Sequence, residues 1–197
     1  MTKKIYMPHL STASHAKPVR TRRAMRRALV ELLGDRHYEQ VSIRDITTQA
    51  GVGYTTFFRH YPAKEALLND LAADQVQQLA SAASSAVQKG DLHAAMLALC
   101  HYVDAHRGLW TVLLSGSAAG AIREEFLRMA GEIAAGQDWP ESWLPAEAGI
   151  ILIVSGVVEL LAWWLRQEEP LAAERVADIL DRSVVTPNVA AVLQEQH

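Results

Sequence analysis

The sequence is poor in the residues that mark disulfide-stabilised or low-complexity proteins. It has one cysteine, Cys100, which excludes an internal disulfide framework and fits a reducing compartment. Eleven glycines and seven prolines in 197 residues are too few for a low-complexity or collagen-like chain. Half of the residues are hydrophobic, so the chain is not disordered and can build one medium domain or two small ones.

A signal peptide and a membrane span are not indicated either. The first nineteen residues are polar and interrupted by Pro8 and Pro18, which predicts a flexible arm over 1–19. The most apolar stretch, 148–165, has nearly the length of a membrane span, but Glu159 lies within it and an amphipathic segment follows. We therefore predict a buried helix there, no contact with a membrane, and a cytoplasmic protein.

The net charge of −3 hides a strong asymmetry along the chain. Residues 1–64 hold twelve of the nineteen Lys and Arg but four of the twenty-two Asp and Glu, a net charge of +8. The remainder carries −11. Such a division points to nucleic acid or another anionic surface as the partner of the basic part, the alternative being a solvated basic face.

Helical periodicity dominates from residue 20 onward and no stretch alternates as a strand, which predicts an all-α fold. The expected helices cover 21–36, 43–50, 54–61, 63–88, 91–107, 109–115, 118–135, 145–167 and 171–185, the last ending before Pro187. In the first helix Arg22, Arg23, Arg26 and Arg27 lie near the start, where cations oppose the helix dipole. A phosphate partner would explain them.

Residues 42–61 have the pattern of a helix-turn-helix, two short helices joined by a turn. Ser42 is a plausible N-cap and Gly51 supplies the left-handed backbone of the turn. Burial of Ile46, Ala50, Val52 and Phe57 leaves Tyr54, Thr55, Thr56, Phe58 and His60 facing outward on the second helix. These side chains suit base edges and thymine methyls in a major groove, and Arg44 and Lys64 suit the phosphates on either side.

This region resembles the TetR-type transcriptional regulators from Thr21 to about Leu71. The family pattern is a Gly-Val turn, an aromatic-rich recognition helix, and a Lys followed by an acid and paired leucines. The chain supplies Gly51-Val52, Phe57-Phe58-Arg59-His60-Tyr61 and Lys64-Glu65-Ala66-Leu67-Leu68, and Ser42-Ile43-Arg44-Asp45-Ile46 also matches. The candidate DNA-binding residues are Thr21, Arg22, Arg44, Gly53, Tyr54, Thr55, Thr56, Phe58, His60 and Lys64.

The resemblance implies two domains. A three-helix DNA-binding domain would occupy 20–66, and a helical bundle for ligand binding and dimerisation would occupy 67–197. A homodimer would then read a palindromic operator in double-stranded DNA. Three residues depart from the pattern: Thr47 replaces an Ala, Gly53 replaces a hydroxyl residue that would cap the recognition helix, and Phe58 replaces a common Tyr. Lys3, Lys4, Lys17 and Arg20 in the arm fit either a minor-groove contact or disorder.

The second half offers candidates for an effector pocket and a dimer interface. Met96, Cys100, His101, Trp110, Phe126, Met129, Trp139 and Trp143 have the apolar and aromatic character of pocket linings, although such residues also form plain core. The helix over 145–167 is apolar nearly all round and needs a partner on two sides. The interface candidates are Val157, Leu161, Trp164, Val176, Ile179 and Leu180. His93, His101 and His106 cannot share one helix face, so neither a metal nor another cofactor is predicted.

The sequence thus predicts a DNA-binding regulator, a repressor released by a small, largely apolar effector. One alternative is a DNA-bound structural or protein-interacting member of the same fold without an effector. The other is a hydrolase using a His–Asp pair, but no nucleophile motif, phosphate loop or pair of carboxylates supports an enzyme.

Overall fold

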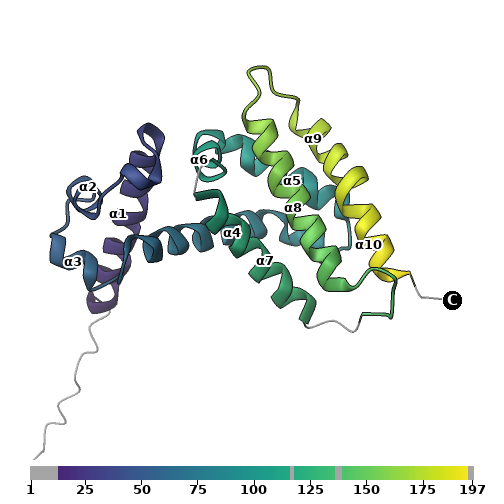
Figure 1. Ribbon diagram of the computed structural model, residues 1–197, viewed down its shortest axis with the longest axis horizontal. Helices are drawn as coiled ribbons and strands as arrows, with labels where there is room; N and C mark the ends of the chain where they lie inside the picture. The colour runs from purple at the N-terminus through teal and green to yellow at the C-terminus, as the bar shows by residue number, and fades with distance from the viewer. Residues whose placement is uncertain (1–12, 116–117, 136–138, 195–197) are drawn as a thin grey trace, which may run out of the picture.

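The computed structural model describes residues 13–115, 118–135 and 139–194, which form helices and loops with no strand among them. Figure 1 shows two lobes joined by one long helix, α4 (Lys64–Gln88). The smaller lobe, which we call the head, contains α1 (Ala13–Asp35), the short turn η1 (Tyr38–Gln40), α2 (Ile43–Gln49) and α3 (Tyr54–Phe58). The larger lobe, the bundle, contains α5 (Leu92–Ala105), α6 (Arg107–Leu113), α7 (Ala118–Ala135), α8 (Ala146–Leu165), α9 (Ala173–Leu180), the π-turn η2 (Asp181–Val185) and α10 (Thr186–Leu193). The predicted all-α fold is confirmed.

The first helix is longer than its sequence pattern predicts. Helix α1 begins at Ala13, so residues 13–19, predicted to be flexible, are helical, while 1–12 of the predicted arm lie outside the described residues. Pro18 lies inside the helix. Arg22 and its neighbours therefore lie in the middle of α1, away from the positive end of the helix dipole.

Helix α4 belongs to both lobes. Its 25 residues span about 37 Å at the usual rise per residue. Its first half packs against α1, and its second half against α5 and α7. Leu67, Leu71, Val76 and Leu79 are all buried along it and belong to one apolar core that continues from the head into the bundle. The predicted domain boundary between residues 66 and 67 thus falls within α4, and the head and bundle share this rigid element.

Helix α8 is the central helix of the bundle and packs against α6, α7, α9 and α10. By length and composition alone it could cross a membrane, but a core helix of a bundle meets the same criteria. Two glycines let the C-terminal helices approach it closely. A Cβ atom on Gly149 would lie 2.5 Å from Val192, and one on Gly156 would lie 2.6 Å from Val184. Glycine at these positions therefore sets how near α8 lies to η2 and α10.

The last helical segment does not end before Pro187, as the sequence pattern predicts, but continues to Leu193. The π-turn η2 accommodates the proline, which stands in the first turn of α10, where its missing N–H is tolerated. Thr186 Oγ1 donates a 2.6 Å hydrogen bond to Asp181 Oδ1, five residues earlier, which is the spacing that a π-turn brings together. The segment is therefore longer than predicted by eight residues, 186–193.

Candidate DNA-binding surface and effector half

The start of α2 is fixed by the cap that the sequence predicts. Ser42 Oγ accepts a hydrogen bond from the backbone N–H of Asp45 at 3.1 Å, and the Asp45 carboxylate accepts from the Ser42 N–H at 2.9 Å. The Ser42 hydroxyl also donates to that carboxylate at 2.7 Å. The two hydrogen bonds that the Asp45 carboxylate accepts lower its pKa below the ordinary value, the one from the Ser42 hydroxyl more than the one from the Ser42 N–H. The reciprocal cap holds the entry of α2 in one orientation.

The turn between α2 and α3 has the predicted geometry. Gly51 has a φ of +64°, a left-handed conformation that favours glycine. The backbone N–H of Val52 donates to the carbonyl of Thr47 at 2.9 Å, which closes the turn. Thr47 is buried, and its hydroxyl donates to the Arg44 carbonyl at 3.1 Å, so the extra polar group is satisfied without a partner on α3. Gly53 caps α3 without a side-chain hydrogen bond, as expected.

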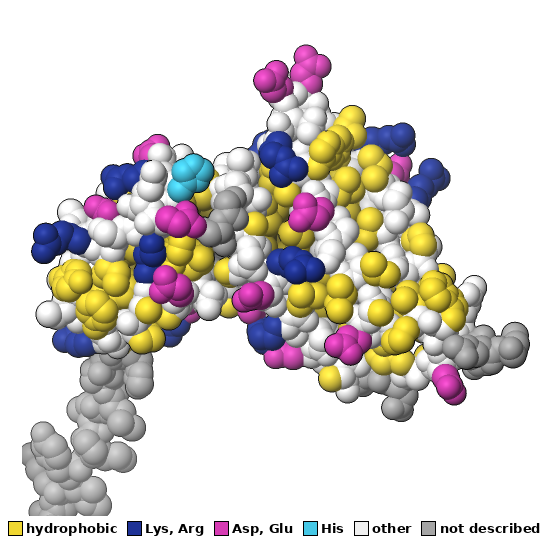
Figure 2. Space-filling view, in the orientation of Figure 1, with side chains coloured by type: hydrophobic (Ala, Val, Ile, Leu, Met, Phe, Trp, Pro, Cys, Tyr) yellow, Lys and Arg dark blue, Asp and Glu magenta, His cyan; other side chains and the backbone are white. Residues whose placement is uncertain are grey.

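Burial of two side chains fixes which face of α3 points outward. Ile46 and Phe57 are fully buried, and the Phe57 ring lies 5.7 Å from the ring of Tyr61. Tyr54 and Phe58 are half exposed and form an edge-on pair with ring centroids 5.4 Å apart. Figure 2 shows hydrophobic side chains gathered at the position of α3, with Lys and Arg side chains around them.

The other outward candidates differ in exposure. Thr55 is exposed, whereas Thr56 and His60 are half-buried beside it. Helix α3 is shorter than predicted, since it ends at Phe58 and residues 59–60 form a turn. Arg59, which sequence reasoning did not select, is exposed at this end of α3. In the sequence, only its position directly after the recognition helix could have identified Arg59 as a candidate.

Lys64, selected as a phosphate contact, makes its hydrogen bonds inside the head. Its ammonium donates to the carbonyls of Tyr38 at 2.7 Å and Val41 at 2.8 Å, and it lies 4.0 Å from the centre of the Tyr38 ring. These contacts tie the start of α4 to η1 and to Val41, two residues before α2. A phosphate contact by Lys64 stays a prediction, and its first role in the described residues is to hold the head together.

Arg22 also has partners inside the head. Its guanidinium pairs with Asp70 on α4 and donates to the Tyr61 hydroxyl at 3.3 Å. Arg26 pairs with the same carboxylate at 3.4 Å and with Asp74 at 3.1 Å. The Tyr61 hydroxyl donates to Asp70 at 2.6 Å, and burial followed by this hydrogen bond raises the pKa of Tyr61 to about 12. Asp70 therefore joins α1, the end of the helix-turn-helix and α4.

The remaining cationic candidate, Arg44, is exposed on α2. Thr21 is half-buried on α1 and has an interaction within the chain. The structure thus brings Tyr54, Thr55 and Phe58 onto one open surface, with Arg44 and Arg59 on the adjoining elements. It assigns Arg22 and Lys64 to contacts within the head.

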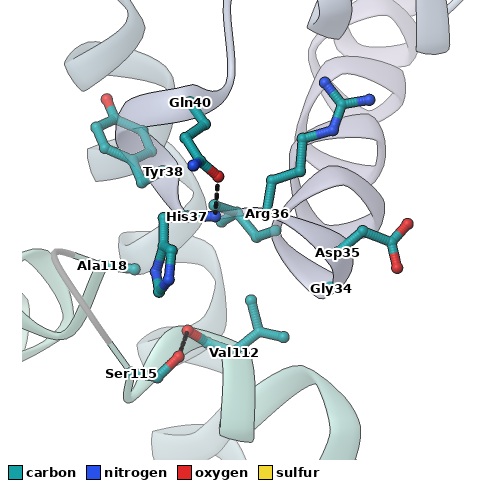
Figure 3. Close-up of a pocket in the computed structure, with 10 residues that line it drawn as sticks. Gly34, Asp35, Arg36, His37, Tyr38, Gln40, Val112, Ser115 and Ala118 are labelled. Atoms are coloured by element: carbon teal, nitrogen blue, oxygen red, sulfur yellow. Dashed lines mark hydrogen bonds between the residues drawn. The ribbon is translucent and has the colours of Figure 1, made fainter.

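A small pocket of about 250 Å³ lies where the head meets the bundle. Its walls are the end of α1 with η1, and the region where α6 is followed by α7. Figure 3 shows the His37 imidazole extending toward Ser115 and Ala118, while the side chains of Arg36 and Asp35 extend away. The Ser115 hydroxyl donates to the Val112 carbonyl at 3.0 Å. A single imidazole from the head therefore approaches the bundle at this junction.

The predicted effector residues do not surround one cavity. Cys100 and Trp110 are fully buried, and the indole N–H of Trp110 has no hydrogen-bond partner within the described residues. Burial raises the pKa of the Cys100 thiol to about 12. His101 is exposed and lies 3.6 Å from Glu174. Of the others, Met96, Phe126 and Met129 are half-buried and Trp143 is exposed.

Trp139 is the predicted effector residue that lines a described groove. The groove lies between α7 and α8, has a volume of about 510 Å³, and is lined almost entirely by apolar side chains, including Leu127 and Ile150. Glu147 is the charged residue in its lining. The Trp139 indole N–H donates to the Ala134 carbonyl at 2.9 Å, so the ring is anchored to the end of α7. This groove suits a small, largely apolar molecule.

The predicted dimer-interface residues need correction. Val157, Leu161, Trp164, Val176 and Leu180 are buried inside the chain, and Ile179 is half-buried. Side chains with at most 6% of their surface exposed offer almost no area to a partner, so these five are core residues of the bundle. The exposed apolar residues on α8 are Ile151, Leu152 and Trp163, on another face of the same helix. The sequence identified the helix, but an almost uniformly apolar pattern cannot identify its outer face.

Metal binding has no structural support in the described residues, where no group of three or more His, Cys, Asp or Glu side chains could hold an ion. Two histidines instead face carboxylates across the interface of α5 with α9 and η2. His93 lies 3.5 Å from Asp181, and His101 faces Glu174.

Comparison with known proteins finds a family model in the head. Residues 26–71 match the model described as "Bacterial regulatory proteins, tetR family". This range runs from the middle of α1 through the helix-turn-helix to the first two turns of α4. No curated protein matches the sequence of the chain.

Solved structures of similar fold cover most of the chain. A TetR transcriptional regulator from Streptococcus agalactiae 2603V is 20% identical, with a TM-score of 0.62, and the match covers 85% of this chain and 95% of that one. NalD from Pseudomonas aeruginosa, named as the secondary repressor of the MexAB-OprM multidrug efflux pump, is 17% identical with a TM-score of 0.61, covering 92% and 100%. RolR in complex with resorcinol is 18% identical with a TM-score of 0.53, covering 93% and 98%. At these identities the likeness shows a shared fold.

Proposed function

We propose that the chain is a regulator of the tetR family, a repressor that binds a palindromic operator as a homodimer. A small, largely apolar effector would release it. The observation that carries the proposal is the surface of α3. Tyr54, Thr55 and Phe58 are exposed there on a scaffold fixed by the buried Ile46 and Phe57. We expect the protein in the cytoplasm and without enzymatic activity of its own.

DNA recognition would divide between α3 and its neighbours. Hydroxyl groups and aromatic edges on α3 suit base edges and thymine methyl groups in the major groove. Arg44 on α2 and Arg59 after α3 are exposed and suit phosphates, which position the protein without reading the sequence. The charge of +8 over residues 1–64 supports a polyanion as the partner of this lobe.

Capture of genomic DNA fragments by the full-length protein at physiological salt tests DNA recognition. We expect a few palindromic sites, and Arg44→Met should weaken binding to all sequences and lower the salt slope by about one. Thr55→Ala should instead relax the preference at particular base pairs. Recovery of random fragments alone, lost as salt rises, would contradict sequence-specific regulation.

The exposed face of α8 is the proposed dimer surface. Ile151, Leu152 and Trp163 lie on one side of the helix and are 42%, 51% and 38% exposed in the described residues of one chain. Ile151 also borders the groove between α7 and α8. Figure 2 shows hydrophobic side chains spread over the bundle in the view shown. Exposed apolar patches on a single chain are typical of interaction surfaces. A second copy paired here would set two α3 helices at a fixed separation, and successive major grooves lie about 34–36 Å apart.

The dimer proposal is tested by Leu152→Glu in sedimentation experiments. We expect a shift from dimer to monomer and a loss of operator binding at protein concentrations at which the unchanged protein binds. Val87→Glu is the matched control, because Val87 is similarly exposed but lies on α4. A monomeric unchanged protein, or a Leu152→Glu variant that remains dimeric, would contradict the proposed surface.

The groove between α7 and α8 is the proposed effector site. Its apolar lining and the Trp139 ring favour a small aromatic or aliphatic molecule, and RolR, of the same fold, is known in complex with resorcinol. Binding there would act on the packing of α7, which also contacts α4, the helix shared with the head. An effector that favours a conformation with displaced α3 helices would lower operator affinity.

Release of operator DNA by a panel of small phenols and aliphatic alcohols tests the effector site. We expect at least one compound to lower operator affinity, and Trp139→Ala to abolish that response while leaving DNA binding without effector unchanged. Trp143→Ala is the control, since Trp143 is more exposed but does not line the groove. If no compound acts, the alternative of a DNA-bound protein without a small-molecule effector gains support.

A further inference from the structure

A second and larger groove lies between the head and the bundle, away from α3 and from the groove of α7 and α8. Its volume is about 820 Å³. Its walls come from three helices: Arg20, Arg23 and Arg27 on α1, Leu71 and Gln78 on α4, and Leu109 on α6. Figure 1 shows α1 in the head and α6 in the bundle, and α1 contacts both α4 and α6. The groove therefore adjoins both lobes at the helix that connects them.

The positive charge in this groove is largely unpaired. Arg20 and Arg23 have no ion pair within the described residues, and Arg27 faces Glu31 at 3.4 Å in a mostly exposed pair of little energetic value. The three arginines are spaced by three and four residues, so they share one side of α1 and repel one another. Asp74, the acid in the lining, is already paired with Arg26 at 3.1 Å.

Apart from Arg26, a fourth arginine of the lining that pairs with Asp74, the rest of the lining is apolar or uncharged. Val30 on α1, Leu71 on α4 and Leu109 on α6 provide hydrophobic surface next to the arginines. The volume lies within the range of about 300–1,000 Å³ that is usual for small-molecule sites. A bare inorganic anion would leave the apolar surface uncovered, and a neutral apolar molecule would leave the arginines unpaired.

We propose that this groove binds a small amphipathic anion, with its anionic group at Arg20 and Arg23 and its apolar body against Leu71 and Leu109. Pairing with the anion would relieve the repulsion among the arginines and cover the apolar surface. Because the walls belong to both lobes, the bound molecule would fix the position of α1 relative to α6. Its coupling to operator binding rests on the proposed function, but its binding does not.

Titration calorimetry of the full-length protein with decanoate, below its micelle concentration and without DNA, tests the proposal. We expect decanoate to bind, and inorganic phosphate and decyltrimethylammonium to bind at least tenfold more weakly. Arg23→Glu should weaken decanoate binding at least tenfold, and Arg23→Gln should weaken it less. Arg182→Glu is the matched control, because Arg182 is exposed on η2 and has no ion pair among the described residues.

Three results would overturn the proposal. The first is the absence of decanoate binding to the unchanged protein. The second is binding that is lost in Trp139→Ala but kept in Arg23→Glu, which would assign decanoate to the groove of α7 and α8. The third is an Arg23→Glu variant that binds decanoate normally but binds all DNA more weakly, which would make Arg23 a phosphate contact. Decanoate binding by a protein that recognises no operator would contradict the proposed function alone.

Discussion

The head and the bundle are held together by different interactions. In the head, polar side chains connect the elements. Lys64 donates hydrogen bonds to two carbonyls, and Ser42 caps α2. Asp70 pairs with Arg22 and Arg26 and accepts a hydrogen bond from the Tyr61 hydroxyl. In the bundle, apolar packing around α8, with two glycines that allow close approach, is joined by a few hydrogen bonds such as that from Arg107 to the Trp164 carbonyl at 2.8 Å. A hydrogen-bonded cap fixes the start of the short helix α2, and burial of Phe57 fixes the face of the short helix α3. Long helices can be oriented by packing alone.

The largest expected effect is in the bundle. Leu161→Ala removes a fully buried side chain from α8 and should lower the free energy of unfolding by about 2–5 kcal/mol. Denaturant unfolding at fixed protein concentration measures this loss. Because Leu161 has no exposed surface, the dimerisation constant of the folded chain should stay unchanged. Weaker dimerisation with an unchanged free energy of unfolding would show that Leu161 lies in the dimer interface, as the sequence pattern predicted.

The next effect is in the head. Lys64→Met keeps an unbranched side chain that is one atom shorter but removes the charged donor to Tyr38 and Val41, and we expect a loss of about 1.5–3 kcal/mol in unfolding free energy. Arg44→Met, on the exposed surface of α2, should leave stability unchanged. A Lys64→Met protein with unaltered stability and a lower salt slope of DNA binding would indicate that Lys64 contacts a phosphate and does not stabilise the head.

A smaller loss is expected where α8 meets η2. Gly156→Ala places a Cβ 2.6 Å from Cγ1 of Val184, a short and branched side chain that cannot easily move away. The strain should exceed the gain in helix propensity and lower stability by roughly 1–2 kcal/mol. Gly131→Ala on α7 meets open space and should raise stability by about 0.5–1 kcal/mol. Equal melting temperatures for the two variants would argue against the close approach.

The smallest effect concerns the hydroxyl of Tyr61. Its pKa is raised from 10 to about 12 by burial and by the hydrogen bond to Asp70, so the folded head favours the protonated phenol. The resulting stability is fully present below pH 10 and is lost as pH rises to about 12. Tyr61→Phe should reduce stability by about 1 kcal/mol at neutral pH and weaken this alkaline dependence. Phenolate absorbance during a pH titration would show whether one tyrosine ionises near pH 12.

Local signals predicted the head well. The Ser42 cap, the left-handed Gly51 and the buried pair of Ile46 and Phe57 all depend on residues close in sequence, and the structure confirms them. Arg22 and Lys64 differ because their partners are distant in sequence. Asp70 lies 48 residues from Arg22, and Tyr38 lies 26 residues from Lys64. A basic pattern indicates that cations are present, but it does not reveal that a distant carboxylate or carbonyl already binds them.

The bundle shows the opposite balance. The sequence identified its helices, including the range 118–135 that the structure reproduces as α7. It misassigned Val157 and Leu161 to a surface, and it ended the last helical segment too early, because a proline after a helix does not reveal that a π-turn can accommodate it. The groove beside Trp139 also arises from two helices that are separated by a loop.

The sequence by itself determined the helical fold, the helix-turn-helix and the basic character of the head, since each follows from short-range spacing, turn chemistry or composition. Only the tertiary structure decided which arginines are free, which face of α8 is exposed, and where grooves open between helices. These properties depend on contacts between residues far apart in the chain. For a helix that is apolar on every side, the buried face is the one that packs against other helices, and those helices are encoded elsewhere in the sequence.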